Sequence, residues 1–431
     1  MTLLGIAWRS IRQRPLQSAL TALSLALGVA LVVATLVVSG VVTRAFASGA
    51  GLGYNMIVGA KGSPLQLVLN SVYLISRPIE NVPWAFYEEF LPAERRRDGR
   101  PGRFASSVRT AIPICMGDYY RGYRVVGTNR GFFERLTGGD GRLFAFAAGE
   151  AFRDDDLYAA VVGAEVAAKL GLGVGDGVAP QHGADATKIH DPFRVAGILA
   201  RTGTPVDRGV FVNMEGFYLQ DGHAKPVAEG TPADPAAPAP GLLPFAEREV
   251  TAILVETAAP PGLPPDLMAM ELSRTLNEGR DAQAAMPVRE MRQLLDLFVR
   301  PLELLLLLVT TLVVIVSAIG ILVSMVGSAL ERSRDVAIMR ALGAGRGRVL
   351  AAVLVEAVVL AGLGGLAGWV IGHGIVAAIA PWVAEQAGVA VGFLSAAPAE
   401  WLLVPLLVGL AVLAALIPAL AAYRTDVARW L

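Results

Sequence analysis

Five residues between positions 182 and 223 have side chains of the types that bind transition metals. They are His182, Asp185, His190, Asp191 and His223, and they lie in polar, loop-like sequence. Structural zinc sites usually present their ligands in closely spaced pairs. The spacing of these five residues matches no standard site of that kind. We therefore expect solvated loop residues at these positions and no metal ion bound by this chain.

The segment Gly59-Ala60-Lys61-Gly62-Ser63 superficially resembles a phosphate-binding loop. That loop requires an upstream glycine at a fixed distance and a lysine directly before Ser or Thr. The segment fails both requirements, so we expect a turn after a strand. No Ser-His-Asp or paired-carboxylate arrangement can be argued from the order of residues along the chain. The sequence therefore indicates no catalytic site.

Two ionisable residues, Glu356 and His373, fall inside a long apolar run. Ionisable residues within a membrane are costly and are often functional. Glu356 lies close enough to one end of the run to pair with an arginine of the preceding segment, so a structural ion pair and a transport role both remain open. The glycines that follow it favour close helix packing; they are Gly362, Gly364, Gly365 and Gly368.

Residues 331–348 (ERSRDVAIMRALGAGRGR) combine positive charge with an apolar stripe. At helical spacing, Val336, Met339 and either Ala341 or Leu342 share one side of a short helix, and Gly343 is placed to end it. An exposed apolar face on a short loop indicates that a partner protein docks there. The residues that we expect at this contact are Glu331, Arg334, Asp335, Val336, Met339, Arg340, Leu342 and Gly343.

The composition indicates a membrane protein. The chain is 54% hydrophobic and 17% charged, with a mean hydropathy of +0.54 and no net charge, whereas soluble domains carry about 25% charged residues. Four apolar runs are long enough to cross a bilayer, which requires about 20 residues in a helix. The zero net charge gives no indication of nucleic-acid binding. The single Cys115 can form no internal disulfide, and we expect it to be a small buried residue.

The first apolar run requires a decision between a signal peptide and a membrane helix. Ala45-Phe46-Ala47 resembles a signal-peptidase site. The hydrophobic region of a signal peptide is only about 7 to 15 residues long. The run from Pro15 to Thr43 is about twice that length, so we expect a retained helix.

The arginines that flank the spans predict their orientation, because cytoplasmic loops hold an excess of Lys and Arg. Basic residues precede the first run, fill the connection between the second and third runs, and follow the fourth; they are Arg9, Arg12, Arg14, Arg332, Arg334, Arg340, Arg346, Arg348, Arg424 and Arg429. The connection between the third and fourth runs holds Glu385 and Glu400 and no Lys or Arg. Both termini are therefore expected in the cytoplasm.

The long segment between the first and second runs is predicted to be an extracytoplasmic α+β domain. Short strands are expected at Tyr158 to Val162, Phe193 to Leu199, Val210 to Val212 and Ile253 to Val255, and helices at Glu165 to Leu170, Met268 to Glu278 and Val288 to Val299. Residues 225–244 are rich in Pro and Ala and are expected to form a flexible loop. The last of the helices leads directly into the second span.

The predicted fold is an α-helical membrane protein with four transmembrane helices and a large extracytoplasmic α+β domain between the first and second spans. The predicted order is an amphipathic surface helix (1–14), first span (15–44), outer domain (45–300), second span (301–330), cytoplasmic coupling loop (331–348), third span (349–380), extracytoplasmic loop (381–400), fourth span (401–423) and cytoplasmic tail (424–431).

The segment from Glu331 to Gly343 resembles the cytoplasmic loop of MacB/FtsX-like ABC transporter permeases, which reads roughly R-x-x-E-I-x-x-L-R-A-L-G-A and touches the ATPase. Asp335 stands where that pattern usually has Glu. Further similarity lies in the N-terminal AWRSIRQRP, in VVGAEVAAKLGLGVGD from Val161 to Asp176, and in FRVAGI from Phe193 to Ile198. The order of one outer domain followed by three closely spaced spans is also that of the family.

The resemblance implies a permease subunit in a bacterial inner membrane, working as a pair with a second copy or a homologue. Two ABC ATPase subunits would bind below it, and an extracytoplasmic accessory protein is a further expected partner. MacB carries a fused ATPase domain before its first span, and this chain begins 14 residues before that span, so a separate ATPase is expected. No cofactor is expected on this chain, because ATP and Mg²⁺ belong to the ATPase.

The resemblance leaves the function open between classes. The first is export or extraction of a peptide, lipoprotein, lipid or hydrophobic compound, driven by movement of the outer domain. The second is an FtsX-like regulator that activates a cell-wall hydrolase outside the membrane. The third is a membrane sensor or an enzyme with its own outer catalytic domain. The sequence favours the first and does not name the substrate.

Overall fold

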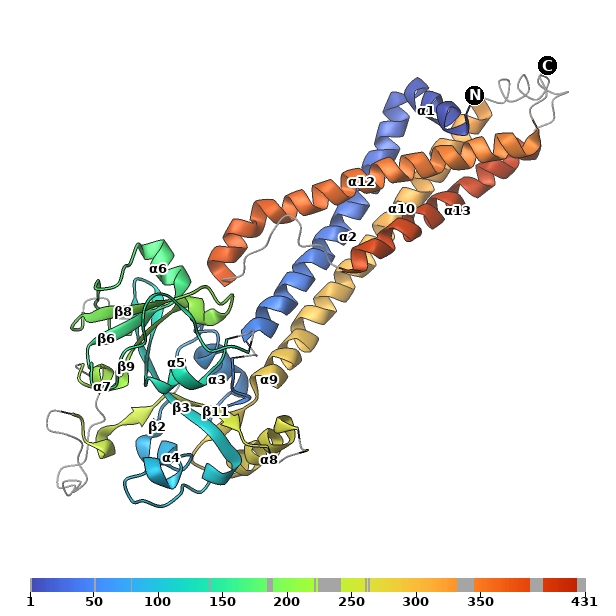
Figure 1. Cartoon of the computed structure of the whole chain (residues 1–431). Coiled ribbons are helices and arrows are strands. Elements are labelled where there is room, and N and C mark those ends of the chain that lie inside the picture. Colours follow the sequence, from blue (N-terminus) through green and yellow to red (C-terminus); the bar gives the residue numbers. More distant parts are fainter. Residues whose placement is uncertain are drawn as a thin grey trace. The chain divides into compact units, whose positions relative to one another are not determined.

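The computed structural model divides the chain into two compact units (Figure 1). One, here called the helical unit, combines Met1–Thr43 with Asp296–Leu431, and the other, the sheet domain, is Arg44–Leu295. The structure describes residues 2–49, 52–78, 80–138, 141–183, 189–220, 222–223, 242–259, 262, 264–331, 345–387 and 398–424.

The sheet domain is built on a ten-stranded mixed sheet in the order β12-β1-β11-β3-β4-β9-β6-β8-β5, with β7 paired to β8. Two neighbouring pairs are parallel, β4 with β9 and β6 with β8, and the other pairs are antiparallel. Its strands are β1 (Met56–Gly59), β3 (Val108–Tyr120), β4 (Tyr123–Thr128), β5 (Phe146–Gly149), β6 (Ala159–Val162), β7 (Gly177–Val178), β8 (Phe193–Leu199), β9 (Gly209–Asn213), β11 (Ala252–Thr257) and β12 (Gln283–Ala285). A separate ribbon pairs β2 (Val82–Pro83) with β10 (Glu249–Val250).

Apolar side chains are buried on both faces of this sheet, because neighbouring residues of a strand point to opposite faces. On β9, Val210 and Val212 join one core cluster while Phe211 joins the other, and on β11 Ile253 and Leu254 divide in the same way. Successive side chains of a strand point to opposite faces, so a sheet that is covered on both sides needs apolar residues at every position. Each such side chain contributes about 1.5–3 kcal/mol when fully buried.

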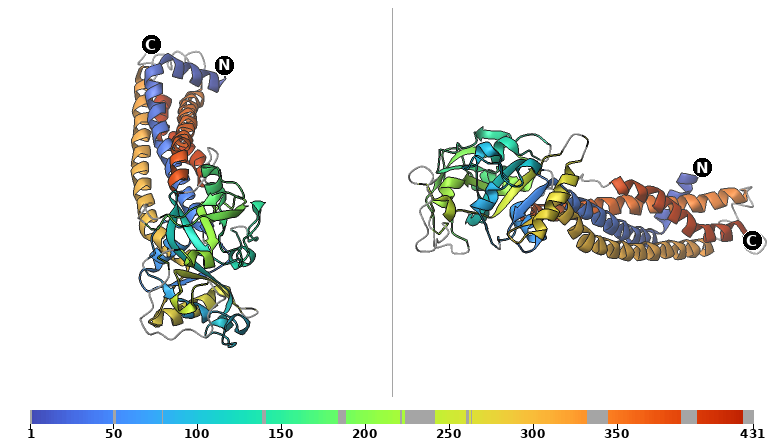
Figure 2. Two further views of the ribbon diagram at one scale, coloured as in Figure 1. Left: turned by 90° about the vertical axis from the view of Figure 1, so that its left-hand side faces the viewer. Right: turned by 90° about the horizontal axis from the view of Figure 1, so that it is seen from below.

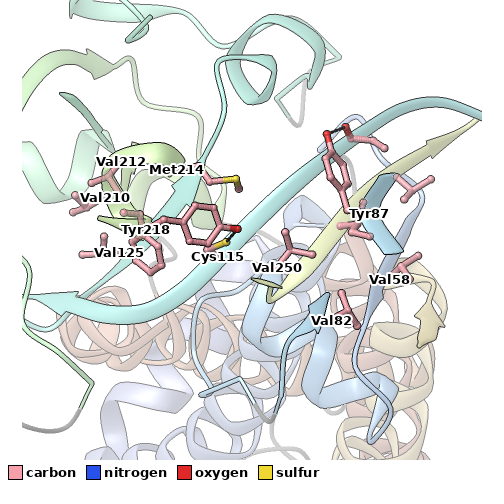
Figure 3. Close-up of a cluster of buried hydrophobic side chains, with 14 of the residues drawn as sticks. Val58, Val82, Tyr87, Cys115, Val125, Val210, Val212, Met214, Tyr218 and Val250 are labelled. Carbon is pink, nitrogen blue, oxygen red and sulfur yellow. Dashed lines mark hydrogen bonds between the residues drawn. The ribbon is translucent and has the colours of Figure 1, made fainter. Parts of the chain in front are cut away.

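One of these clusters surrounds Cys115 (Figure 3). Its thiol donates to the carbonyl oxygen of Glu249 at 3.2 Å and lies 3.1 Å from the Tyr218 hydroxyl. Burial raises the pKa of the Cys115 thiol to about 12. The expectation of a small buried residue is confirmed.

Short helices connect the strands and cover the sheet (Figure 1). They are α3 (Pro64–Ser71), α4 (Trp84–Glu88), α5 (Gly131–Arg135), α6 (Ala164–Leu170), α7 (Met214–Tyr218), α8 (Pro265–Glu278) and α9 (Pro287–Leu294). The segment at Gly59 to Ser63 is the predicted turn after a strand, since β1 ends at Gly59 and the Ser63 hydroxyl caps α3. The strands and helices predicted in this region are confirmed, each to within a few residues.

The helical unit consists of α1 (Leu3–Gln13), α2 (Pro15–Gly49), α10 (Arg300–Glu331), α12 (Arg346–Ala387) and α13 (Leu403–Arg424), with a short 3₁₀ helix, η6 (Pro398–Leu402), before α13. Within the described part of the chain, four stretches are long and apolar enough to cross a membrane: Pro15–Gly40, Pro287–Gly327, Gly347–Pro381 and Glu400–Leu420. A π-helical turn, η5 (Leu295–Val299), joins α9 to α10 without a break in the helix. Two helices run past the predicted limits, α2 to Gly49 and α12 to Ala387.

Glycines on α12 allow α2 to approach closely where the two helices cross (Figure 1). Figure 2 shows the same helices in two further views. A Cβ added at Gly364, Gly368 or Gly372 would lie 2.5–2.9 Å from a backbone carbonyl oxygen of α2. These residues recur at every fourth position and therefore share one helix face. The expected close packing is present at Gly364 and Gly368, whereas a Cβ at Gly362 meets no described atom within 4 Å.

Hydroxyl groups join α2 to α10 along the same bundle. The Ser317 hydroxyl donates to the Ser24 backbone carbonyl at 3.1 Å, and the two serine hydroxyls are also 3.1 Å apart. Such bonds between helices are worth about 0.6 kcal/mol on average in a membrane. The bundle is therefore held mainly by close side-chain packing.

Candidate functional sites

Three of the chain's four histidines converge on a buried aspartate in the sheet domain. His190 Nε2 and His223 Nε2 lie 3.4 and 3.2 Å from Asp118 Oδ2, and His182 Nδ1 lies 3.5 Å from Asp118 Oδ1. The nitrogens also face one another: His190 Nε2 is 3.4 Å from His182 Nδ1 and 3.3 Å from His223 Nε2. Among the residues that the structure describes, this is the one group of three or more potential metal ligands with converging atoms.

A β-bulge places Asp118 in this cluster. The register of β3 against β4 shifts between Met116 and Tyr119, so the residues between them leave the regular ladder. Bulges redirect side chains and are common beside functional sites. The next residue, Tyr119, exchanges two backbone hydrogen bonds with Gln181, which also bridges to Ile189. Asp118, His182 and His190 are thus each adjacent to a residue of one small backbone network.

The fourth member, His223, follows α7 and is fixed by separate contacts. Its ring lies edge-on to the Phe217 ring, with centroids 4.2 Å apart. The Gln220 side chain accepts a hydrogen bond from the Asp191 backbone N–H at 3.0 Å. This bond links the segment after α7 to the segment that carries His190.

The expectation of solvated loop residues is wrong for His190 and His223, two of the five residues to which it applied. The side chains of His190 and His223 are 4% and 5% exposed and that of Asp118 is 0% exposed, whereas His182 is 38% exposed. Backbone pairing of Gln181 with Tyr119 of β3, and of Ile189 with Gln181, holds the segments of His182 and His190 against the sheet, and residue spacing along the chain does not reveal this. Asp191 is exposed as expected, and Asp185 lies outside the described residues.

Glu356 contacts the N-terminal helix of the same helical unit. The Ser10 hydroxyl of α1 donates to its carboxylate, and Ser10 is itself buried. Most of the preceding arginine-rich segment lies outside the described residues, so the expected ion pair with that segment is not tested. The Ser10 contact joins α1 to α12.

His373 belongs to a buried polar group in the helical unit. Its Nε2 lies 3.3 Å from Glu400 Oε2, the Trp369 indole N–H donates to the same oxygen at 3.0 Å, and the Trp369 and His373 rings meet edge-on at 4.4 Å. Trp369 and Glu400 also line an apolar cavity of about 280 Å³ between α2, α12 and α13. These contacts anchor η6 to α12, a connection that the sequence did not predict.

Nearly all of the expected ATPase-coupling segment lies outside the described residues. α10 ends at Glu331, and the next described residue is Gly345. Arg334, Asp335, Val336, Met339, Arg340, Leu342 and Gly343 therefore stay predictions from sequence, and so does the role of Glu331.

Two models of known protein families match this chain, and together they cover most of both units. The model of the MacB-like periplasmic core domain matches residues 18–257, more than half of the chain, and the model of the FtsX-like permease C-terminal region matches residues 307–427. A named relative is the uncharacterized ABC transporter permease YknZ of Bacillus subtilis (strain 168). The two proteins are 46% identical over 70 residues, which cover 16% of this chain and 18% of YknZ.

The family matches fit the architecture described above. The first begins within α2 and ends with β11, and the second runs from α10 through α13. A mixed-sheet domain between the first and second of four apolar helices is the arrangement expected for this family. The chain is a multi-pass membrane protein and belongs to the MacB/FtsX-type ABC transporter permeases.

Proposed function

We propose that this chain couples ATP hydrolysis, carried out by a partner ABC ATPase, to movement of the sheet domain outside the cytoplasm. The work done there is export or extraction of a peptide, lipoprotein, lipid or hydrophobic compound. In this account residues 331–348 receive the ATPase. The partner holds ATP and Mg²⁺, and the permease chain itself binds no nucleotide.

The observation that carries this proposal is the presence of both family regions in one chain, with residues 331–348 between α10 and α12. The charge of that segment supports a cytoplasmic position, because positive residues are retained on the cytoplasmic side. The same rule supports cytoplasmic termini and, for a bacterial permease, an inner-membrane location. Two permease copies, or one copy with a homologue, and two ATPases complete the proposed assembly.

The helix that follows the sheet domain offers a path for the movement. α9, η5 and α10 form uninterrupted helix from Pro287 to Glu331. A helix transmits displacement along its axis because each residue is hydrogen-bonded to the next turn. The π-helical turn at Leu295–Val299 marks the position in this helix where the hydrogen-bond pattern changes, and such turns are frequent at functional sites.

Co-purification tests whether residues 331–348 receive an ATPase. The chain is co-expressed with each ABC ATPase subunit of its own genome, and a tag on the chain captures the complex in detergent. We expect the native chain to capture one kind of ATPase subunit among those tested. The double variant Met339→Asp/Arg340→Glu should capture none, because it changes both the apolar face and the positive charge of residues 331–348.

A matched control makes the same chemical change in the C-terminal tail. Val427→Asp/Arg429→Glu also replaces one apolar and one basic residue by acidic residues, and it should leave the captured ATPase unchanged. Equal loss in both variants would indicate a general effect of acidic charge. Retention of the ATPase by the Met339→Asp/Arg340→Glu variant would remove residues 331–348 from the proposed contact.

A further inference from the structure

We propose that Asp118, His182, His190 and His223 form a tetrahedral binding site for a divalent transition-metal ion, with Zn²⁺ as the best fit. No such site was expected from the spacing of these residues in the sequence. The proposal concerns the sheet domain alone and does not depend on the ATPase partner.

The distances between the four donor atoms have the size of a zinc coordination shell. With Asp118 Oδ2 as the carboxylate donor, four of the six separations are 3.2–3.4 Å. His182 Nδ1 lies 3.5 Å from the other carboxylate oxygen, Oδ1, and one donor atom from each residue can be chosen so that all four lie within 4.8 Å of one another. A regular tetrahedron with edges of about 3.3 Å has its centre about 2.0 Å from each corner, which is the distance at which Zn²⁺ binds histidine nitrogen and carboxylate oxygen. A single ion at that centre would contact all four residues.

The orientation of the rings supports a common centre. The three imidazole centroids are 5.0–5.5 Å apart and the planes cross at 70–84°. The measured nitrogen pairs are only 3.3–3.4 Å apart. Each ring therefore turns a nitrogen-bearing edge inward, which is the arrangement that a metal ion requires and that stacking between rings does not produce.

Hydrogen bonds alone do not account for the contacts of His190 Nε2. This atom lies within 3.4 Å of His182 Nδ1, His223 Nε2 and Asp118 Oδ2. A ring nitrogen carries one N–H or one lone pair, so it can direct one good hydrogen bond. A cation in the middle of the group satisfies all four atoms at once.

The burial of Asp118 points to the same conclusion. Its side chain is 0% exposed. Three histidine nitrogens lie 3.2–3.5 Å from its oxygens, but among the described residues none donates to them with the geometry of a hydrogen bond. An isolated buried carboxylate is strongly destabilising unless a cation or hydrogen-bond donors offset its charge. Metal coordination by both the carboxylate and the histidines provides that compensation.

The ligand set selects the class of ion. Imidazole nitrogen suits Zn²⁺ and its transition-metal neighbours, whereas Mg²⁺ and Ca²⁺ prefer six or more oxygen ligands. Four protein ligands leave no open position for water, as in structural rather than hydrolytic zinc sites. The bound ion would therefore join β3 to the segments that carry His182, His190 and His223. The partly exposed His182 marks the side from which the ion enters.

Zinc retention by the purified full-length chain tests this proposal. The detergent-solubilised protein is stripped with a chelator, dialysed against Zn²⁺ and then against buffer, and analysed for metal by mass spectrometry. We expect about one ion per native chain and an affinity at least about tenfold weaker for Asp118→Asn. Asp191→Asn is the matched control, because Asp191 is exposed and lies outside the cluster.

Two further measurements keep the test decisive. Co²⁺ bound in place of Zn²⁺ should give the intense visible absorption of tetrahedral cobalt in the native chain and in Asp191→Asn. Should Asp118→Asn fail to fold, His182→Ala replaces it, since His182 is the most exposed of the four side chains. A native chain that retains no Zn²⁺, or equal zinc loss in Asp191→Asn, overturns the proposal.

Discussion

At the scale of single residues, the environment of Cys115 determines its reactivity. The thiolate is the nucleophile in alkylation, and burial raises the pKa of this thiol from 9.0 to about 12. The raised pKa favours the protonated form, so at pH 7 to 9 the folded protein exposes almost no thiolate. Cys115 should therefore react slowly throughout that pH range.

This prediction is checked by iodoacetamide labelling followed by mass spectrometry of the intact chain. Native protein should remain mostly unmodified at pH 7 and pH 9, and denatured protein should be labelled quickly, faster at the higher pH. Rapid labelling of native protein at pH 7 would show that the thiol is accessible and that the core around it opens.

The histidine cluster shows which residue-level features the sequence can reveal. His182, His190 and His223 were recognised as metal-ligand types, because three of the four histidines fall within a short stretch. Asp118 was missed, since it comes from a strand 64 residues earlier in the chain than His182. Their meeting depends on a bulge in β3 and on backbone pairing, which residue spacing does not encode.

At the scale of elements, the glycine face of α12 determines how closely α2 can approach. A Cβ at Gly368 would lie 2.5 Å from the Ala26 carbonyl oxygen and 2.7 Å from Val29 Cβ. Gly368→Val should therefore separate the helices and lower the free energy of unfolding by roughly 1–3 kcal/mol, as overpacking does elsewhere.

The matched control for this prediction is Gly374→Val on the same helix, where an added Cβ meets no described atom within 4 Å. Thermal unfolding of both purified variants in one detergent measures the difference. A midpoint lowered equally in the two variants would show that helix propensity, rather than contact with α2, determines the loss.

The membrane helices could be predicted from sequence because their length and apolarity are local properties. The predicted strands of the sheet domain are apolar runs bounded by turn residues, and they were found for the same reason. β3 was not predicted, although it is the longest strand. Pro113 and Gly117 interrupt its apolar pattern, and both residues are depleted in strands. Pairing with β11 and β4 overrides that local signal.

At the scale of the whole molecule, the proposed topology predicts which residues a membrane-impermeant reagent can reach. Arg274→Cys lies on the sheet domain, where the native side chain is 74% exposed. In intact spheroplasts it should react with an impermeant maleimide. Arg429→Cys in the tail should react only after the membrane is permeabilised.

The native chain provides the background for this labelling, because its one cysteine is buried. Labelling of Arg429→Cys in intact spheroplasts, with protection of Arg274→Cys, would reverse the topology and place the arginine-rich segment outside. The ATPase contact proposed for residues 331–348 would then be excluded.

ATP turnover in lipid tests the central claim most directly. The chain and its ATPase are reconstituted together, and turnover is compared for native protein, Met339→Asp/Arg340→Glu and the control Val427→Asp/Arg429→Glu. We predict that the native chain and the control change the turnover of the ATPase to the same extent. In the first variant the effect on turnover should be roughly tenfold smaller, as expected when the contact that carries a coupling of typically about 5- to 150-fold is lost. Identical turnover with native permease, with either variant and with no permease would contradict the account.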